Sequence, residues 1–216
     1  NNMTLTKRST KGSALTFDEL DGNFTHLGGD GSYQFPATDG TANEVLQTDG
    51  NGNLTFQSAG ITEVDQWRTT TDTTYNNTNI VSSNWERTDS DFWNDDYIGT
   101  GLTEASGVFT IPTTGKYLLT FNFRGYHPTV TFAFMNIIPE YDDGNGYSSM
   151  ASVATENYNG GATAPQNLSS SLLINAADSN RKFRFQIQMN NNGYRIQGNT
   201  AFNETGFQIM RLGDSV

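Results

Sequence analysis

Apolar and polar residues alternate most regularly in two segments of the second half of the chain, 117–124 and 182–189. Because successive side chains of a β-strand point to opposite faces, a period of two predicts strands with one face on a hydrophobic core. Shorter apolar runs predict further strands at 109–111, 130–134, 172–174 and 207–209. Their number and spacing favour an all-β fold, an antiparallel two-sheet sandwich.

Turn residues separate these predicted strands. Pro112, which is followed by two threonines and Gly115, predicts a turn from one strand into the next. Asn192-Gly193 is a strong hairpin signal. The regular pattern begins near Ile61, so we interpret residues 61–216 as a single head domain.

The preceding segment, 31–60, has only short apolar runs between glycine-rich turn signals such as Asp39-Gly40 and Asp49-Gly50. These runs are too small to enclose a core of their own. We interpret the segment as a thin trimeric shaft, whose strands pair with those of neighbouring chains. A flexible linker is the alternative.

The first 30 residues contain one helical signal. Thr16 and Glu19 have the spacing of a capping box, which marks the start of a helix. The apolar residues that follow recur at helical spacing and form one stripe: Phe17, Leu20, Phe24 and Leu27. A helix of about three turns is too short to persist alone. We therefore predict that 1–30 is an anchor whose stripe docks on a partner.

Composition and charge exclude several classes of partner. Only 34% of the residues are hydrophobic, and Gly, aromatic and small polar residues favour strands and turns over helices. The 12 basic and 23 acidic residues give a formal charge of −11. A nucleic acid or an anionic membrane would be repelled by this charge, so we expect neither as a partner.

The chain contains no cysteine, which excludes disulfides and thiolate chemistry. No apolar run approaches the about 20 residues that a membrane-spanning helix requires, so we expect no membrane insertion. Residues 1–11 lack the apolar centre of a signal peptide.

The segment 107–121, GVFTIPTTGKYLLTF, resembles the paired strands that characterise the globular head of the first complement component, a relative of tumour necrosis factor. The resemblance extends over about 65–212 and includes the final segment 200–209, TAFNETGFQI. The family positions are matched by Leu102, Phe109, Gly115, Tyr117 and Phe121. This resemblance implies a ten-strand jelly roll that assembles as a homotrimer.

Residues 11–27, KGSALTFDELDGNFTHL, resemble a segment often found near the start of tail-fibre and related appendage proteins of tailed bacteriophages. Residues 35–50, FPATDGTANEVLQTDG, are similar to shaft-like segments of the same proteins. Together these resemblances imply a virion location and contacts with other virion proteins through the N-terminal segment.

No catalytic group is indicated. His26 and His127 are the only histidines, and neither has the spacing of a metal pair or of a base beside a nucleophile. We therefore predict no enzymatic activity and no catalytic residue.

Two acidic clusters have the oxygen ligands that calcium prefers. Asp89, Asp91 and Asp95 form the first, and Glu140, Asp142 and Asp143 the second. Neither has the spacing of a calcium-binding loop, so we expect solvated loops and no cofactor, with bound calcium as the alternative.

The same loops are rich in aromatic residues, a mixture that suits the binding of a host-surface glycan or protein. The candidate ligand-binding residues are Trp85, Trp93, Asp95, Tyr97, Asp142, Asp143 and Tyr147. The alternative is that most of the tryptophans belong to the core.

Three functional hypotheses follow from these observations. The first is a trimeric virion fibre or appendage whose head recognises the host surface. The second is a capsid or tail decoration protein without receptor binding. The third is a glycan depolymerase, which would need a pair of carboxylates facing a groove.

Overall fold

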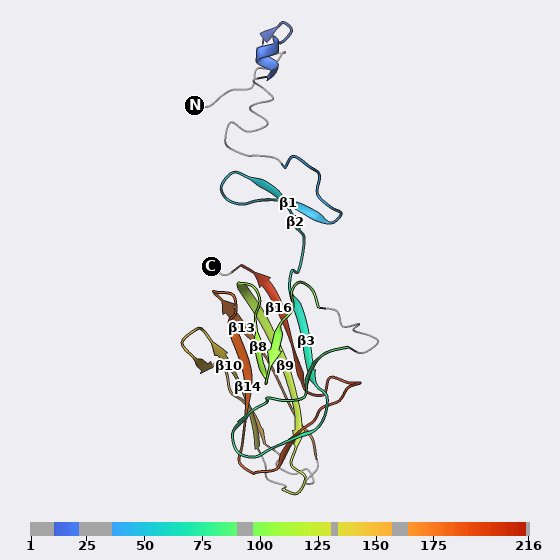
Figure 1. The fold of residues 1–216 in the computed structure, drawn as a ribbon, viewed down its shortest axis with the longest axis vertical. Helices are drawn as coiled ribbons and strands as arrows, with labels where there is room; N and C mark the ends of the chain where they lie inside the picture. The colour runs from blue at the N-terminus through green and yellow to red at the C-terminus, as the bar shows by residue number, and fades with distance from the viewer. Residues whose placement is uncertain (1–10, 22–35, 90–96, 131–133, 157–163, 215–216) are drawn as a thin grey trace. The chain divides into compact units, whose positions relative to one another are not determined.

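The computed structural model describes residues 11–21, 36–89, 97–130, 134–156 and 164–214 (Figure 1). The chain divides into two compact units, residues 1–60 and 61–216, and each is described separately. Several residues singled out above lie outside the described ranges: Phe24, Leu27, Asp91, Trp93 and Asp95.

The described part of the first unit contains a helical segment and one hairpin. Residues 17–21 are helical, and the predicted capping box is present. The Thr16 amide donates to Glu19 Oε2 at 2.7 Å, and the Glu19 amide donates to Thr16 Oγ1 at 3.2 Å. The hairpin pairs β1 (Glu44–Thr48) with β2 (Leu54–Ser58) in antiparallel register. Its turn is held by Asp49, whose carboxylate accepts from the amides of Asn51 and Asn53.

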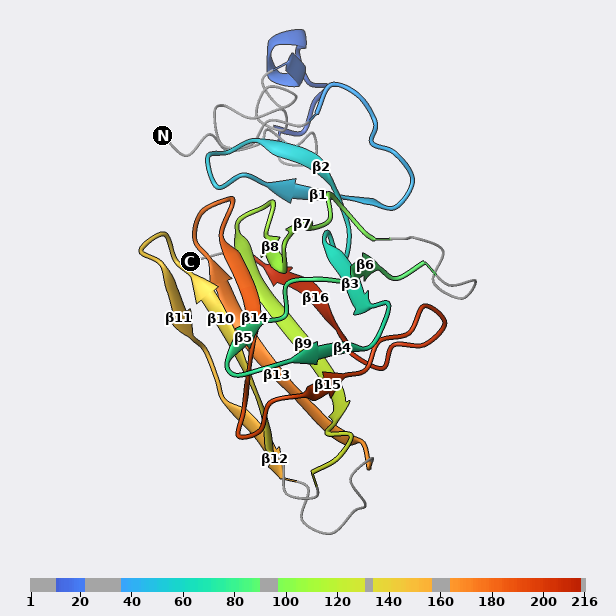
Figure 2. The same cartoon turned by 60° about the horizontal axis from the view of Figure 1, so that its bottom comes forward.

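The second unit, the head, is a sandwich of two antiparallel sheets (Figures 1 and 2). The first, called here the β9 sheet, has the order β4-β15-β9-β16-β3-β6, and β13 pairs with β9. Its strands are β3 (Val64–Thr69), β4 (Thr73–Tyr75), β6 (Trp85–Arg87), β9 (Gly115–Tyr126), β13 (Gln166–Ala176), β15 (Tyr194–Ile196) and β16 (Gly206–Gly213).

The second sheet, called here the β14 sheet, has the order β11-β10-β14-β8-β7, while β12 pairs with β10 and β5 with β14. Its strands are β5 (Asn79–Ile80), β7 (Thr103–Ala105), β8 (Val108–Thr110), β10 (Phe134–Asp142), β11 (Tyr147–Ser149), β12 (Val153–Glu156) and β14 (Lys182–Met189). Each sheet contributes one face to the space between them, as the alternating pattern predicts.

The core lies between the sheets and is largely aromatic. The alternate residues of 117–124 and 182–189 that were predicted to face the core are buried there: Tyr117, Leu119, Phe121, Phe123, Phe183, Phe185, Ile187 and Met189. Phe109 and Phe207 meet edge to face with ring centroids 4.5 Å apart. The all-β, antiparallel sandwich predicted from the sequence is therefore confirmed.

One predicted loop is a strand instead. The segment from Glu140 was interpreted as an acidic loop, but β10 continues to Asp142, where it pairs with Lys182 of β14. Pro139, which lacks an amide proton, disfavours a strand in the sequence. In the structure its carbonyl accepts from the Met150 amide at 2.8 Å, and the sheet tolerates the missing donor.

Among the described residues, no helix is long and apolar enough to cross a membrane.

The turn between β7 and β8 depends on Gly107, which has a φ of 77°. A Cβ atom at this position would lie 2.2 Å from the carbonyl oxygen of Val81. We expect Gly107→Ala to lower the free energy of unfolding by about 1–3 kcal/mol, because it adds both backbone strain and a steric clash. Urea denaturation of the head measures this loss. Gly213→Ala, where the added Cβ meets no atom within 4 Å, is the matched control, and equal losses in the two variants would contradict the prediction.

Candidate functional site

Trp85, one of the predicted ligand-binding residues, is partly buried and packs against the core. Its ring packs edge to face on Phe109 and Phe207, with centroid distances of 5.2 and 5.7 Å. Its Nε1 donates to the Val81 carbonyl at 2.7 Å. Trp67 is buried. The structure thus favours the alternative that tryptophans serve the core, and the described tryptophans offer no exposed ring for a ligand.

Asp142 and Asp143 shape the turn between β10 and β11. Asp142 Oδ1 accepts from the amides of Gly144 and Gly146 at 2.8 and 3.0 Å, and Asp143 Oδ1 accepts from the Asn145 amide at 3.0 Å. The two amide donors are the main reason that the pKa of Asp142 lies below its ordinary value. These bonds stabilise the turn at neutral pH and are lost as the pH falls through the lowered pKa.

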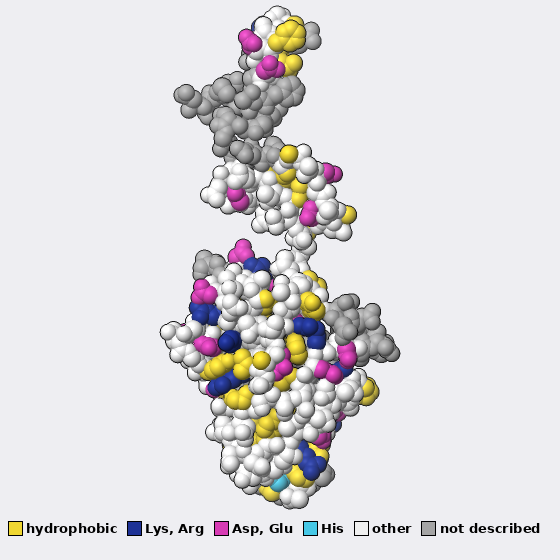
Figure 3. Space-filling view, viewed as in Figure 1, with side chains coloured by type: hydrophobic (Ala, Val, Ile, Leu, Met, Phe, Trp, Pro, Cys, Tyr) yellow, Lys and Arg dark blue, Asp and Glu magenta, His cyan; other side chains and the backbone are white. Residues whose placement is uncertain are grey.

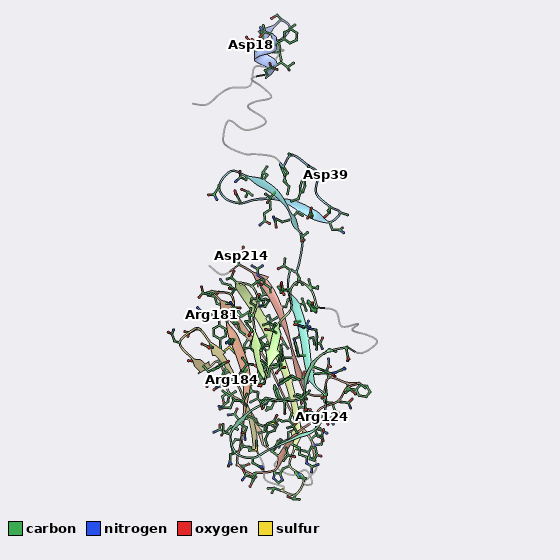
Figure 4. The ribbon with its side chains drawn as sticks, in the orientation of Figure 1. Asp18, Asp39, Arg124, Arg181, Arg184 and Asp214 are labelled. Carbon is green, nitrogen blue, oxygen red and sulfur yellow. The ribbon has the colours of Figure 1, made fainter. Side chains whose placement is uncertain are left out.

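Tyr147 and Glu140 hold one arginine on the outer face of the β14 sheet. The guanidinium carbon of Arg184, labelled in Figure 4, lies 3.7 Å from the centre of the Tyr147 ring. Arg184 Nε also donates to Glu140 Oε2 at 2.6 Å. Burial raises the pKa of Tyr147. The Tyr147 ring therefore packs on the ion pair of Arg184 with Glu140, in which one positive and one negative charge cancel.

The described residues contain no group of three or more His, Asp or Glu side chains that could hold a metal ion. Asp89 is engaged in an ion pair with the buried Arg68, and Glu140 is engaged with Arg184. The other two members of the first calcium candidate, Asp91 and Asp95, lie outside the described residues.

Tyr97 packs on another arginine, Arg87, at the side of the head formed by β3 and β6. The guanidinium of Arg87 lies between the rings of Tyr97 and Trp67, at 4.3 and 4.9 Å from their centres. Arg87 donates to both carboxylate oxygens of Asp65, at 2.9 and 3.0 Å, and Asp65 Oδ2 also accepts from the Leu102 amide at 2.7 Å. Tyr97 is therefore held against a buried ion pair with part of its ring exposed.

A neighbouring buried carboxylate, Glu63, secures the same segment of chain. It accepts from the amides of Thr100 and Gly101 at 2.8 and 3.1 Å. Val64 and Ile98 exchange backbone hydrogen bonds of 2.9 and 3.1 Å. The described segment 97–102 is thus attached to β3 at several points. Of the predicted ligand-binding residues, Tyr97 lies here, while Asp142, Asp143 and Tyr147 lie together at the β10–β11 turn.

A row of apolar side chains that was not predicted from the sequence lies on the outer face of the β9 sheet. In the strand register Leu173 is opposite Leu118, Leu118 opposite Met210, and Met210 opposite Val64. Val64 is in turn paired with Ile98. Because directly paired residues share a face, these five residues form one continuous line across the sheet, called here the apolar row. Leu173 is 74% exposed and Ile98 is 49% exposed.

The row next to the apolar row on this outer face is polar and uncharged. The next row along the strands contains only hydroxyl and amide side chains: Ser171, Thr120, Gln208 and Gln66. Thr120 and Ser171 are hydrogen-bonded to each other at 2.9 Å. By contrast, basic, acidic and hydrophobic side chains are interspersed on the face of the head visible in Figure 3.

One end of the apolar row opens into a shallow depression of about 360 Å³. Leu173 and Leu212 line it, together with Lys116. Leu212 is 56% exposed. The doublets Leu118-Leu119 and Leu172-Leu173 are the signal that could have revealed this surface. In an alternating strand, one member of such a doublet must lie on the outer face.

Comparisons with known proteins place the head among jelly-roll folds. No protein-family model and no curated protein matches the chain. The Eiger TNF structure from S. frugiperda aligns with a TM-score of 0.52 and 12% identity, over 73% of this chain and 96% of that one. Murine APRIL at pH 5.0 aligns with a TM-score of 0.51 and 13% identity, over 69% and 98%.

The globular domain of the zebrafish complement 1qA protein aligns with a TM-score of 0.44 and 13% identity, over 71% of this chain and 99% of that one. At these identities the comparisons show the fold alone. The Eiger TNF and APRIL alignments, whose TM-scores exceed 0.5, confirm the jelly-roll architecture that the segment 107–121 implied for the head.

Proposed function

We propose that this chain is a structural virion protein of a tailed phage, a homotrimeric fibre or appendage whose head recognises the host surface without enzymatic activity. The apolar row is the observation that supports the proposal of a trimer. A head that remained monomeric would leave Leu173, Ile98 and Leu212 in water, and burying one such side chain contributes about 1.5–3 kcal/mol.

The geometry of the row suits a closed ring. In a cyclic trimer each contact joins two different surfaces, so one edge of a subunit meets the opposite edge of its neighbour. The row runs from β13 at one edge of the sheet to Ile98 at the other. The Leu173 end of one copy would therefore meet the Ile98 end of the next, and the uncharged row of hydroxyl and amide groups would lie beside this contact without any buried charge.

The first unit supports attachment to a larger particle. Phe17 is 87% exposed and Leu20 is 41% exposed on a correctly capped helical segment, whose hydrophobic side chains are visible in Figure 3. The hairpin β1–β2 carries Leu46, Leu54 and Phe56 on one face. A two-stranded hairpin is marginally stable alone, so association with other copies would stabilise it. The resemblance of 11–27 and 35–50 to phage appendage segments supplies the virion context.

Labelling intact virions with antibodies against the head tests the proposal. Label on tail fibres or appendages is the expected result, and label on the capsid would favour the decoration protein instead.

Purified full-length protein should reduce phage adsorption to the host, because it occupies the same receptors. Undiminished adsorption at saturating protein would contradict receptor recognition. Shortening of host polysaccharide by the protein would favour the depolymerase.

The helical segment gives a separate prediction. We expect Phe17→Asp and Leu20→Asp to remove the protein from virions while the head stays folded, because each would bury a charge at the attachment site. Asp18→Asn, on the same turn of helix, is the matched control and should be incorporated normally. Immunoblots of purified particles measure incorporation, and normal levels of both Asp variants would place the anchor elsewhere.

A further inference from the structure

A loop between β15 and β16, residues 197–205, projects from the head beside the edge formed by β3 and β6 (Figures 1 and 2). Its base is bonded to β3 on both sides: the Asn199 amide donates to the Thr69 carbonyl at 2.8 Å, and the Thr69 amide donates to the Thr205 carbonyl at 3.0 Å. Asn122 Nδ2 bonds the Glu204 carbonyl at 2.8 Å. The loop is therefore held in place by several backbone contacts.

The loop 197–205 exposes one large aromatic side chain. Phe202 is 69% exposed, and the Glu204 amide donates to its carbonyl at 3.0 Å. An exposed aromatic ring on a constrained backbone loses little conformational freedom on binding, so it is a suitable anchor for a ligand. Neither the core nor the apolar row requires this side chain.

Buried polar atoms without partners gather around the same loop. Of the seven buried side-chain atoms that lack a hydrogen bond in the described part of the head, three belong to the loop or to the arginine beneath it. These are Gln197 Oε1, Asn203 Oδ1 and Arg124 Nε. Arg124, labelled in Figure 4, is paired with Glu204 through Nη1 at 3.2 Å.

Two more of these atoms belong to Arg68, on β3, and to Thr88, which directly follows β6. Arg68 Nη1 and Thr88 Oγ1 are both buried without a partner. Arg68 is opposite Gly206, the residue that directly follows the loop. Because buried polar groups in proteins almost always have partners, such a concentration indicates a site that water or a ligand completes.

We propose that this loop is the binding site for an uncharged saccharide, with Phe202 as its stacking platform. This inference rests on the proposed function, because it assigns the recognition of the host surface to a particular loop. The arginine atoms donate hydrogen bonds, the two amide oxygens accept them, and the threonine hydroxyl does both. A sugar hydroxyl also does both, and the C–H face of a sugar ring packs on an aromatic side chain. Arg124 and Asn203 are partly exposed, so a rotation of either side chain would be enough to present its unpaired atom to a ligand.

The charges around the loop exclude an anionic ligand. Glu204 is paired with Arg124, while Glu86 and Asp89 are both paired with the single buried Arg68. The local charge is therefore negative, and a carboxylated or phosphorylated sugar would be repelled. A second copy of the chain is the other occupant that could cover Phe202, and it is distinguished by its effect on oligomeric state.

A glycan array and affinity electrophoresis of the full-length protein test the site. We expect wild-type protein to bind at least one neutral glycan of the array and to migrate more slowly in gels that contain the matching neutral polysaccharide. Phe202→Ala should weaken this binding about 10-fold or more, since it removes the stacking surface. Phe202→Trp should retain it, and Asn203→Ala should weaken it without changing the oligomeric state.

Ser149→Ala, on the exposed outer face of the β14 sheet, is the control that should leave glycan binding unchanged. Binding only to carboxylated or phosphorylated glycans, or to none on the array, would overturn the inference. So would dissociation of the Phe202→Ala oligomer, which would identify a second copy as the occupant. If wild-type and Phe202→Ala proteins compete equally for phage adsorption, the saccharide site is wrong while the recognition function stands. Failure of the wild-type protein to compete contradicts the function itself.

Discussion

Leu173→Asp is expected to convert the proposed trimer into folded monomers. Leu173 is the most exposed member of the apolar row, and in the trimer its side chain would face the neighbouring copy. A carboxylate at this position would lose its hydration in a largely apolar contact, which costs more free energy than the leucine contributes. Light scattering at micromolar concentration should give the mass of one chain in place of three.

The matched control is Ser149→Asp, which places the same charge on the exposed outer face of the β14 sheet. This variant should remain trimeric, and both variants should keep the circular dichroism of a β-protein. A wild-type protein that is a stable monomer, or a Leu173→Asp variant that stays trimeric, would contradict the assignment of the apolar row to the subunit interface.

Arg87→Met is expected to lower the free energy of unfolding by about 3 kcal/mol, because it leaves the buried Asp65 without its cationic partner. Asp65 is 2% exposed and would retain the amides of Leu102 and Gln66 as donors but no cationic partner. The substitution also removes the guanidinium that packs between Trp67 and Tyr97. Urea denaturation monitored by tryptophan fluorescence measures the loss.

Arg195→Met provides the comparison, since Arg195 lies on the surface and makes only a long hydrogen bond, 3.4 Å, to Tyr126. The Arg195→Met substitution should lower the free energy of unfolding by no more than about 0.5 kcal/mol. In the double variant Arg87→Met/Asp65→Asn, part of the stability should return because the unpaired charge is removed. A loss at Arg87 no larger than that at Arg195 would show that the ion pair contributes little to stability.

The strands that face the core were predictable because their signal is local. The alternation at 117–124 and 182–189 specifies which side chains are buried, and the structure confirms each of them. The capping box at Thr16 was equally readable, since it depends on two residues three positions apart. The acidic residues from Glu140 were wrongly interpreted as a loop, because a strand can include charged residues and the preceding Pro139 when its neighbours supply other bonds.

The candidate sites were harder to predict because their members are distant in sequence. Trp85 has the polar surroundings of a loop residue along the chain, yet its ring fills the space between the sheets. The apolar row joins Val64, Ile98, Leu118, Leu173 and Met210, and no local pattern connects them. The exposure of Phe202 likewise depends on how the loop is attached to β3.

The sequence by itself therefore determined the class of fold, the core faces of the long strands and the cap of the N-terminal helical segment, because each depends on the chemistry of residues close together in the chain. Only the tertiary structure decided which side chains meet on the outer faces. A shift of one residue in the pairing of β9 with β13 or β16 would move Leu173 and Met210 away from Leu118. That register is set by the packing of the two sheets around their shared core, which no single segment contains.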